Sequence, residues 1–153
     1  MASMTRERLK VQYLHTLTGQ PRIPTRAYPD DAGYDLYVSE TTTIPPGAFV
    51  DIPTGVAVQL PEWAWGMLTG RSSTLRKRGL LVNTGIIDAG YRGELYAGAF
   101  NLTQQEVVVE AGDRIAQLII LENSTAVTEM PLIPDEQLDP HDRGTNGFGS
   151  SGQ

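Results

Sequence analysis

One glycine-rich stretch organises the chain: Asn83-Thr84-Gly85-Ile86-Ile87-Asp88-Ala89-Gly90-Tyr91-Arg92-Gly93. It places an amide, a carboxylate, a phenol and a guanidinium among three glycines. Glycine lets the backbone turn tightly and approach a ligand closely. Because Asp-Ala-Gly-Tyr between apolar segments is typical of a β-turn, the stretch predicts a narrow β-loop with a polar tip. Such a loop is either an ordinary hairpin or one wall of a ligand site.

Short apolar segments flank this loop and recur along the chain. Residues 80–82 enter the loop and residues 94–102 leave it as predicted strands, and residues 9–13 alternate between apolar and polar side chains as in a half-buried strand. Further strands are expected around residues 50–52, 56–60, 107–109 and 115–121, the last two joined as a hairpin by a turn at 110–113. With 16 glycines and 10 prolines, the sequence favours an all-β domain. Continuous apolar strands need cover on both faces, from a sandwich or from an oligomer.

A short helix is predicted directly before the loop-entering strand. Ser72 and Ser73 can cap a helix that continues to Arg78, and Gly79 would end it. Backbone amides at a helix start favour anions, and Arg71 with the two hydroxyls adds charge and donors. The stretch is therefore either a helix cap beside a surface arginine or part of an anion site.

Composition excludes several functional classes. The chain has no cysteine, so it offers no disulfide, thiolate zinc site or cysteine nucleophile. His15 and His141 lie far apart and beside no other catalytic group, which argues against a histidine triad or metal site. The net charge of −6 argues against a nucleic-acid partner, and no apolar run approaches the roughly 20 residues that span a bilayer. We expect a cytoplasmic protein that binds neither nucleic acid nor membrane.

Two further stretches carry polar groups. Residues 32–36 follow two aspartates, so three carboxylates including Asp35 lie close together and could attract magnesium, directly or through its waters. A turn that leads into an edge strand explains the same residues without a metal. Gln117 interrupts an apolar run within residues 112–118 and needs a hydrogen-bond partner. That partner could be a neighbouring strand, another subunit or water at a site.

The end of the sequence changes character. Prolines punctuate an acidic connector, and the last residues are rich in glycine, so we predict a flexible arm at 139–153 after a domain at 1–138. Residues 1–3, which precede a second methionine, are treated as a suspected vector-derived addition. Residues 147–152 match the dinucleotide-binding glycine pattern literally, but no helix follows them. The arm is either an idle tail or a lid, with Phe148 stacked on a base and Arg143 paired with phosphate.

Taken together and in this order, five stretches resemble the motifs of the trimeric deoxyuridine triphosphatase (dUTPase) family: residues 32–36, 70–73, 83–93, 112–118 and 143–152. The resemblance covers the chain from Leu9 to Gly152. It implies a jelly-roll-like β-sandwich or barrel with one short helix, and a homotrimer whose active sites are shared between subunits and closed by the arms. It also implies Mg2+-assisted hydrolysis of dUTP to dUMP and pyrophosphate, which keeps uracil out of DNA and supplies dUMP for thymidylate synthesis.

The same resemblance implies roles for the residues of the central loop. Asp88 would be the general base that activates water for attack on the α-phosphorus. Asn83, Ile86 and Ile87 would bind the uracil edge and leave no room for the methyl group of thymine. Tyr91 would lie against the deoxyribose and exclude a 2′-hydroxyl.

Other residues are implied around the phosphates. Arg71, Ser72 and Ser73 would hold phosphate oxygens, and Gln117 would help to position the phosphates or the attacking water. The lid would comprise Arg143, Phe148, Gly149 and Ser150. Asp35 would reach magnesium through coordinated water, and Tyr96 aligns with a substrate-contacting position that varies in the family.

Two alternatives stay open at this point. The dCTP deaminases share the fold and the Arg-Ser-Ser element, but they use a glutamate on the strand after the loop, where this chain has Gly98. A trimeric regulatory protein that keeps the pocket as a nucleotide sensor would also preserve the motifs. Such a protein would bind dUTP tightly and release no pyrophosphate.

Overall fold

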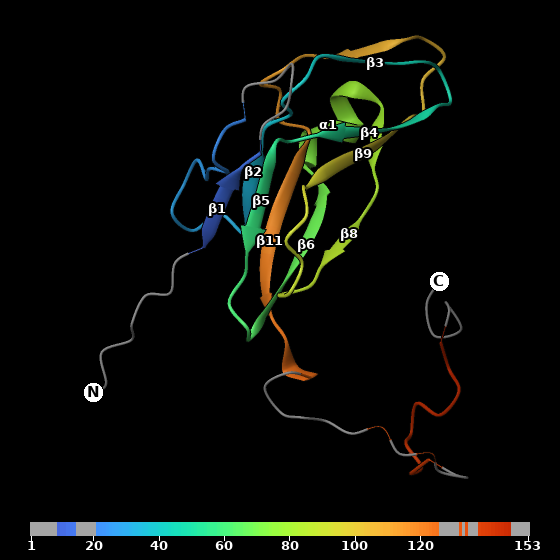
Figure 1. Cartoon of the computed structure of the whole chain (residues 1–153). Helices are drawn as coiled ribbons and strands as arrows, with labels where there is room; N and C mark the ends of the chain where they lie inside the picture. The colour runs from blue at the N-terminus through green and yellow to red at the C-terminus, as the bar shows by residue number, and fades with distance from the viewer. Residues whose placement is uncertain (1–8, 15–20, 126–131, 133, 135–137, 148–153) are drawn as a thin grey trace.

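Strands dominate the computed structural model, which describes residues 9–14, 21–125, 132, 134 and 138–147 (Figure 1). The first half of the chain contains β1 (Lys10–Tyr13), β2 (Gly33–Leu36), β3 (Thr42–Ile44), β4 (Phe49–Pro53), β5 (Val56–Gln59) and β6 (Ala64–Gly70). The helix α1 (Ser72–Arg78) follows, and then β7 (Leu80–Val82), β8 (Gly85–Ile87), β9 (Tyr96–Asn101), β10 (Val107–Val109) and β11 (Ala116–Glu122). The all-β prediction with a short helix is confirmed.

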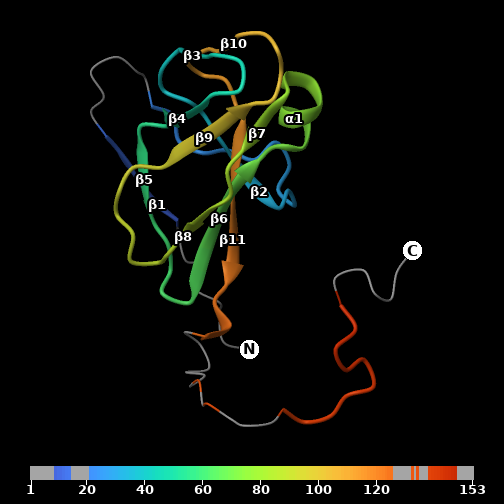
Figure 2. The ribbon, with the colours of Figure 1, turned by 90° about the vertical axis from the view of Figure 1, so that its right-hand side faces the viewer.

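The strands form antiparallel sheets that wrap around one core in a jelly-roll-like arrangement. The largest sheet has the order β2-β11-β6-β8, and a second sheet has the order β4-β9-β7. The pairs β1-β5 and β10-β3 complete the body. Figure 2 shows α1, β3 and β10 gathered at one end of the body, while β8 runs toward the other end. In both views the described residues of the arm lie apart from the β body.

Aliphatic side chains from every larger sheet meet in the core. The fully buried ones include Leu36, Ile52, Val56, Leu68, Leu80, Ala97 and Leu118. Each buried leucine or isoleucine contributes on the order of 2 kcal/mol relative to an exposed position. The period of two along the strands thus fixes which face of each sheet points inward.

The central loop is wider than predicted. Strands β7 and β9 pair as expected, with Leu80 opposite Asn101 and Val82 opposite Ala99. Between them the chain leaves this sheet as β8, which pairs with β6 through Gly85–Ile87. The predicted turn is present after β8, where the Tyr91 amide donates to the Asp88 carbonyl over 3.0 Å. The loop therefore bridges two sheets.

The predicted hairpin between residues 107–109 and 115–121 is wrong. Strand β10 pairs with β3, whereas β11 pairs with β2 and β6. The turn between them exists, because the Asp113 amide donates to the Glu110 carbonyl over 2.9 Å. Turn residues favour a chain reversal, but they do not choose the strand that accepts the next segment.

The predicted helix is present, but its start differs from the expectation. Arg71 occupies the N-cap position with extended backbone angles, and no side chain caps the helix. Gly79 ends the helix as predicted, with a left-handed φ of 67°. Among the described residues, no helix is long and apolar enough to cross a membrane.

One buried polar side chain ties the loop after β9 to the core. The Asn101 amide group donates to the carbonyls of Ile44 (2.9 Å) and Gln105 (2.7 Å). Its oxygen accepts from the backbone amide (2.9 Å) and the hydroxyl (2.7 Å) of Thr103. Buried polar groups are tolerated only when they are paired in this way.

We predict that Asn101→Ala lowers the free energy of unfolding by about 3 kcal/mol, because buried carbonyl and amide groups lose their partners. Urea denaturation measures the change. Gln104→Ala, an exposed substitution in the same loop, is the control and should change stability by less than about 0.5 kcal/mol. Equal effects of the two substitutions would contradict the role of Asn101.

Candidate active site

A cavity of about 260 Å³ lies beside β8 and the turn that follows it. Six of the predicted substrate-binding residues line it: Asn83, Ile86, Ile87, Asp88, Tyr91 and Tyr96. Its other walls come from β4, β6, β9 and the segment directly before β9, and they include Asp51, Leu68, Gly98 and Glu94. Residues from four different strands thus meet around one space. We call this space the loop cavity.

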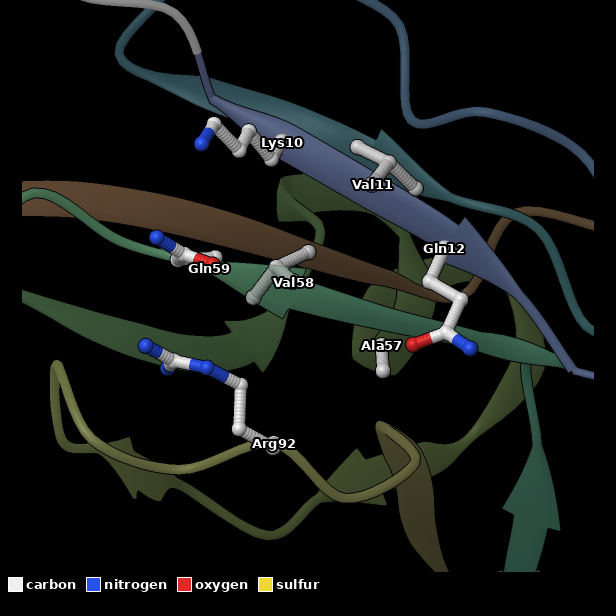
Figure 3. Close-up of a pocket in the computed structure, with 7 residues that line it drawn as sticks. All are labelled: Lys10, Val11, Gln12, Ala57, Val58, Gln59 and Arg92. Carbon is white, nitrogen blue, oxygen red and sulfur yellow. The ribbon is translucent and has the colours of Figure 1, made fainter.

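An arginine holds the turn that carries Asp88 and Tyr91. The Arg92 guanidinium donates to the carbonyls of Ala89 (2.6 Å) and Tyr91 (3.1 Å). Figure 3 shows the same side chain extending toward Gln59, on the side of β1 and β5. Arg92 therefore supports the turn from outside the loop cavity, while the Asp88 side chain stays exposed at its rim.

The ring of Tyr91 folds back over Gly93. Its hydroxyl donates to the Glu94 carbonyl over 2.8 Å. A Cβ atom on Gly93 would collide with the phenol ring. The glycine is thus required for close approach, and it fixes the orientation in which Tyr91 lines the loop cavity.

Two carboxylates of the loop cavity, Glu94 and Asp51, were missed by sequence reasoning. A side-chain hydrogen bond to Glu94 raises the pKa of Tyr96 above its ordinary value of 10.0. Glu94 also accepts from the Gly55 amide over 3.0 Å. Asp51 lies opposite Gly98 in the β4-β9 ladder. The register of β4 and β9 places Asp51 at the loop cavity, and no feature of the sequence indicates that register.

Gly98 leaves no room for a larger residue. A Cβ atom there would lie 2.7 Å from the Phe49 ring and 2.8 Å from Asp51 Oδ1. A glutamate at this position would have to displace the Phe49 ring and the Asp51 carboxylate. The geometry therefore agrees with the absence of the deaminase carboxylate from the sequence.

Two of the other predicted phosphate-binding residues, Arg71 and Ser73, line a second cavity at α1. This space of about 340 Å³ is lined by Arg71, Ser73, Thr74, Lys77, Arg78, Gly112, Asp113 and Arg114. We call it the helix cavity. Asp35 lies next to it and accepts from Arg71 Nε (2.9 Å) and Arg114 Nη1 (3.3 Å). Ser72 is exposed at the first position of the helix.

Gln117 meets a neighbouring strand. Its Nε2 atom donates to the Gly70 carbonyl over 2.9 Å, directly before Arg71. A Cβ atom on Gly33 would collide with the Gln117 amide. Of the partners left open by the sequence, the neighbouring strand is therefore the one observed, and Gln117 links β2, β11 and β6.

The loop cavity and the helix cavity lie far apart within one chain. Ile87 pairs with Gly66, so Asp88 lies beside the start of β6, whereas Arg71 follows its end. The six residue-to-residue steps from Trp65 to Arg71 span roughly 20 Å in an extended strand. One chain therefore does not bring Asp88 to Arg71, Ser72 and Ser73.

The predicted lid is only partly described. Arg143 belongs to the arm, where its Nε donates to the Asn146 carbonyl over 2.7 Å and its backbone amide donates to His141 Nδ1 over 3.1 Å. The remaining lid residues, Phe148, Gly149 and Ser150, lie outside the described residues.

Comparisons with known proteins agree with this architecture. The dUTPase family model matches residues 20–152, so the chain belongs to the dUTPase family. It is 42% identical over 134 residues to the deoxyuridine 5′-triphosphate nucleotidohydrolase of Leifsonia xyli subsp. xyli, covering 86% of each chain. It is 43% identical over 133 residues to the enzyme of the same name from Nocardia farcinica, covering 85% of this chain and 78% of that protein.

Solved dUTPase structures share the fold. The dUTPase of Staphylococcus bacteriophage 80alpha, solved with dUpNHpp, superposes with a TM-score of 0.85 at 33% identity, covering 95% of this chain and 99% of that chain. A dUTPase from the S. aureus phage phi11, whose structure reveals the coordination of a structural Mg(II) ion, superposes with a TM-score of 0.78 at 29% identity. That match covers 88% of this chain and 100% of the phage chain.

We predict that Gly93→Ala displaces the Tyr91 ring and destabilises the loop by about 1 kcal/mol, because a methyl group enters an occupied space. NMR of the Tyr91 ring reports the displacement, and urea denaturation reports the stability. Gly90→Ala is the matched control, since nothing lies within 4 Å of its Cβ position. Unchanged Tyr91 resonances in Gly93→Ala would show that the ring is not held against residue 93.

Proposed function

We propose that this protein hydrolyses dUTP to dUMP and pyrophosphate. The observation that carries the proposal is the loop cavity, where Asp88 lies at the rim of a space lined by Asn83, Ile86, Ile87 and Tyr91. The named activity of the family relatives supports the same conclusion. Removing dUTP keeps uracil out of DNA and supplies dUMP for thymidylate synthesis. The expected cytoplasmic location stays a prediction.

The nucleoside half of the substrate occupies the loop cavity. Asn83 and the backbone at Ile86 and Ile87 read the edge of uracil, and the tight β8 segment leaves no space for a methyl group at its C5 atom. Tyr91, fixed over Gly93, lies against the deoxyribose and excludes a 2′-hydroxyl. Tyr96 closes the same space from β9. Selection against dTTP and UTP is therefore steric.

Asp88 acts as the general base. Its carboxylate accepts a proton from a water molecule as that water attacks the α-phosphorus, and the bond from this phosphorus to the bridging oxygen of pyrophosphate breaks. The side chain is exposed at the cavity rim, where a water molecule can reach it. The turn held by Arg92 keeps the carboxylate in place.

The triphosphate binds at the helix cavity. Arg71, Ser72 and Ser73 donate to phosphate oxygens, because hydroxyl and guanidinium groups are suited to that task. Gln117 acts by holding the Gly70 carbonyl, which fixes the start of this segment.

Asp35 would hold magnesium through coordinated water. Among the described residues, no group of three or more acidic, histidine or cysteine side chains is placed to hold a metal. Asp35 gives one contact to each of two arginines, and a carboxylate retains further lone pairs that accept from metal-bound water. Magnesium on the triphosphate neutralises charge and orients the phosphates.

A complete site needs a second copy of the chain. Asp88 must lie within reach of the α-phosphorus, and the phosphate-binding residues must contact oxygens attached to it or to its neighbours. The separation of roughly 20 Å along β6 prevents one chain from supplying both. We therefore propose a homotrimer in which the loop cavity of one subunit faces the helix cavity of another, and in which the arm with Arg143, Phe148, Gly149 and Ser150 covers the bound nucleotide.

An exposed row of apolar side chains supplies a surface for this assembly. This row crosses β4, β9 and β7 and consists of Phe49, Phe100 and Leu81. The ring centroids of Phe49 and Phe100 are 4.6 Å apart. Phe49, Phe100 and Leu81 are 42%, 40% and 45% exposed in the single chain. Contiguous exposed apolar groups commonly mark subunit contacts.

The two alternative functions receive no support. Gly98 stands where a deaminase needs a carboxylate, and the surrounding space is filled. The family match and the named relatives favour hydrolysis over a solely regulatory role.

The direct test incubates the protein and magnesium separately with dUTP, dTTP, UTP and dCTP, and measures pyrophosphate and ammonia. Pyrophosphate from dUTP alone supports the proposal. Ammonia from dCTP would replace it with deamination, and tight dUTP binding without pyrophosphate would replace it with the regulatory role.

We predict that Asp88→Asn lowers kcat at least about 100-fold, because the base is lost while the shape is kept. Nucleotide affinity, measured by calorimetry, should change little. Glu106→Gln, an exposed substitution elsewhere, should leave kcat unchanged. Retained turnover in Asp88→Asn would remove Asp88 from its role as the base.

A mixing experiment tests whether sites are shared between subunits. Asp88→Asn and Arg71→Ala chains, each inactive alone, should regain activity when they assemble together, because one subunit supplies Asp88 and its neighbour supplies Arg71. Random mixing in equal amounts restores about a quarter of the sites. If the mixture stays inactive although mixed trimers are detected by native mass spectrometry, each site is contained within one chain.

A further inference from the structure

Two cations of the helix cavity, Lys77 and Arg78, lie outside the sequence motifs and the proposed catalytic residues. Lys77 lines this space together with Arg71, Ser73 and Arg114. From the sequence, the basic end of the helix is the solvated end of a surface helix. The structure instead directs this lysine to the side of the helix that carries Ser73. Residues four apart share one face of an α-helix, which explains why Ser73 and Lys77 line the same space.

The neighbouring cations already have partners. Arg78 pairs with Asp113 over 2.9 Å and also donates to the Val108 carbonyl over 2.7 Å. Arg71 and Arg114 share Asp35. Lys77 is exposed and forms no ion pair with any residue that the structure describes.

Positive charges therefore outnumber negative charges around the helix cavity. Arg71, Lys77, Arg78 and Arg114 face two carboxylates, Asp35 and Asp113, which leaves two positive charges. The whole chain carries −6. A triphosphate that approaches an acidic protein is attracted most strongly to such a local excess of positive charge.

We propose that Lys77 binds the pyrophosphate half of the nucleotide. This inference rests on the proposed function and extends the phosphate contacts along α1 by one turn, about 6 Å beyond Ser73. Because the uracil and the sugar occupy the loop cavity, the phosphates of the substrate fill the helix cavity. Lys77 thereby helps the protein distinguish a triphosphate from dUMP, because dUMP lacks the phosphates that this side chain reaches.

The chain offers a matched control. Arg76 is exposed on the same helix and does not line the helix cavity. Lys77→Gln and Arg76→Gln remove the same charge from adjacent positions. Lys77→Arg keeps the positive charge and tests whether that charge is sufficient for phosphate binding. Because all these side chains are exposed, thermal unfolding midpoints should be unchanged.

The test measures the KM for dUTP and the inhibition constants of dUMP and of inorganic pyrophosphate with magnesium. Lys77→Gln should raise both the KM for dUTP and the inhibition constant of pyrophosphate about tenfold, as expected for one lost charged contact. The dUMP constant should stay unchanged, and Lys77→Arg should restore most of the affinity. Identical behaviour of Lys77→Gln and Arg76→Gln would overturn the proposal.

Calorimetry with inorganic tripolyphosphate separates this inference from the proposed function. If the wild-type protein does not hydrolyse dUTP, the proposed function fails, but weaker tripolyphosphate binding by Lys77→Gln than by Arg76→Gln still supports the phosphate site. No tripolyphosphate binding by the wild-type protein, or equal binding by both variants, would refute the role of Lys77.

Discussion

The pairing of β11 with β2 and β6 is the constraint on which both the fold and the phosphate site depend. It aligns Gln117 with Asp35 on one side and with Thr69 on the other. Segments that are about 80 residues apart in the sequence thereby meet at one sheet edge, where Asp35 can hold Arg71 and Arg114. The two ladders are stabilised by backbone hydrogen bonds and by buried Leu36, Leu68 and Leu118. A register shift of one residue would turn Gln117 away from Gly70.

The two cavities differ in charge, as the proposed binding of a nucleotide requires. The helix cavity carries an excess of cations within an acidic protein. The loop cavity contains Asp51, Asp88 and Glu94 and no cation, which suits an uncharged base and sugar better than a phosphate. Asp88 lies beside the start of β6 and Arg71 follows its end. The proposed catalysis therefore depends on the proposed assembly, in which copies of the chain would meet to orient the substrate.

Close approach at glycine positions shapes the loop cavity as much as its polar groups do. Gly93 admits the Tyr91 ring, and Gly98 admits Phe49 and Asp51 from the neighbouring strand. A side chain at either position would displace groups that line the space. The proposed selection for dUTP therefore rests on the shape of the loop cavity, which the hydrogen bonds of Arg92 and Tyr91 keep in place.

The sequence by itself determined the all-β class, the helix at 72–78 with its glycine end and the turn after Asp88. These features follow from local chemistry, namely side-chain alternation, turn composition and glycine placement. The resemblance of the sequence motifs to the dUTPase family indicated six of the residues that line the loop cavity. Only the tertiary structure decided that β10 and β11 pair with different strands and that Arg71, rather than a serine, occupies the N-cap position of the helix. It also decided that Asp51 and Glu94 line the loop cavity and that Lys77 lines the helix cavity. Each depends on strand register or on packing between distant segments, and neither is encoded in any single stretch of the chain.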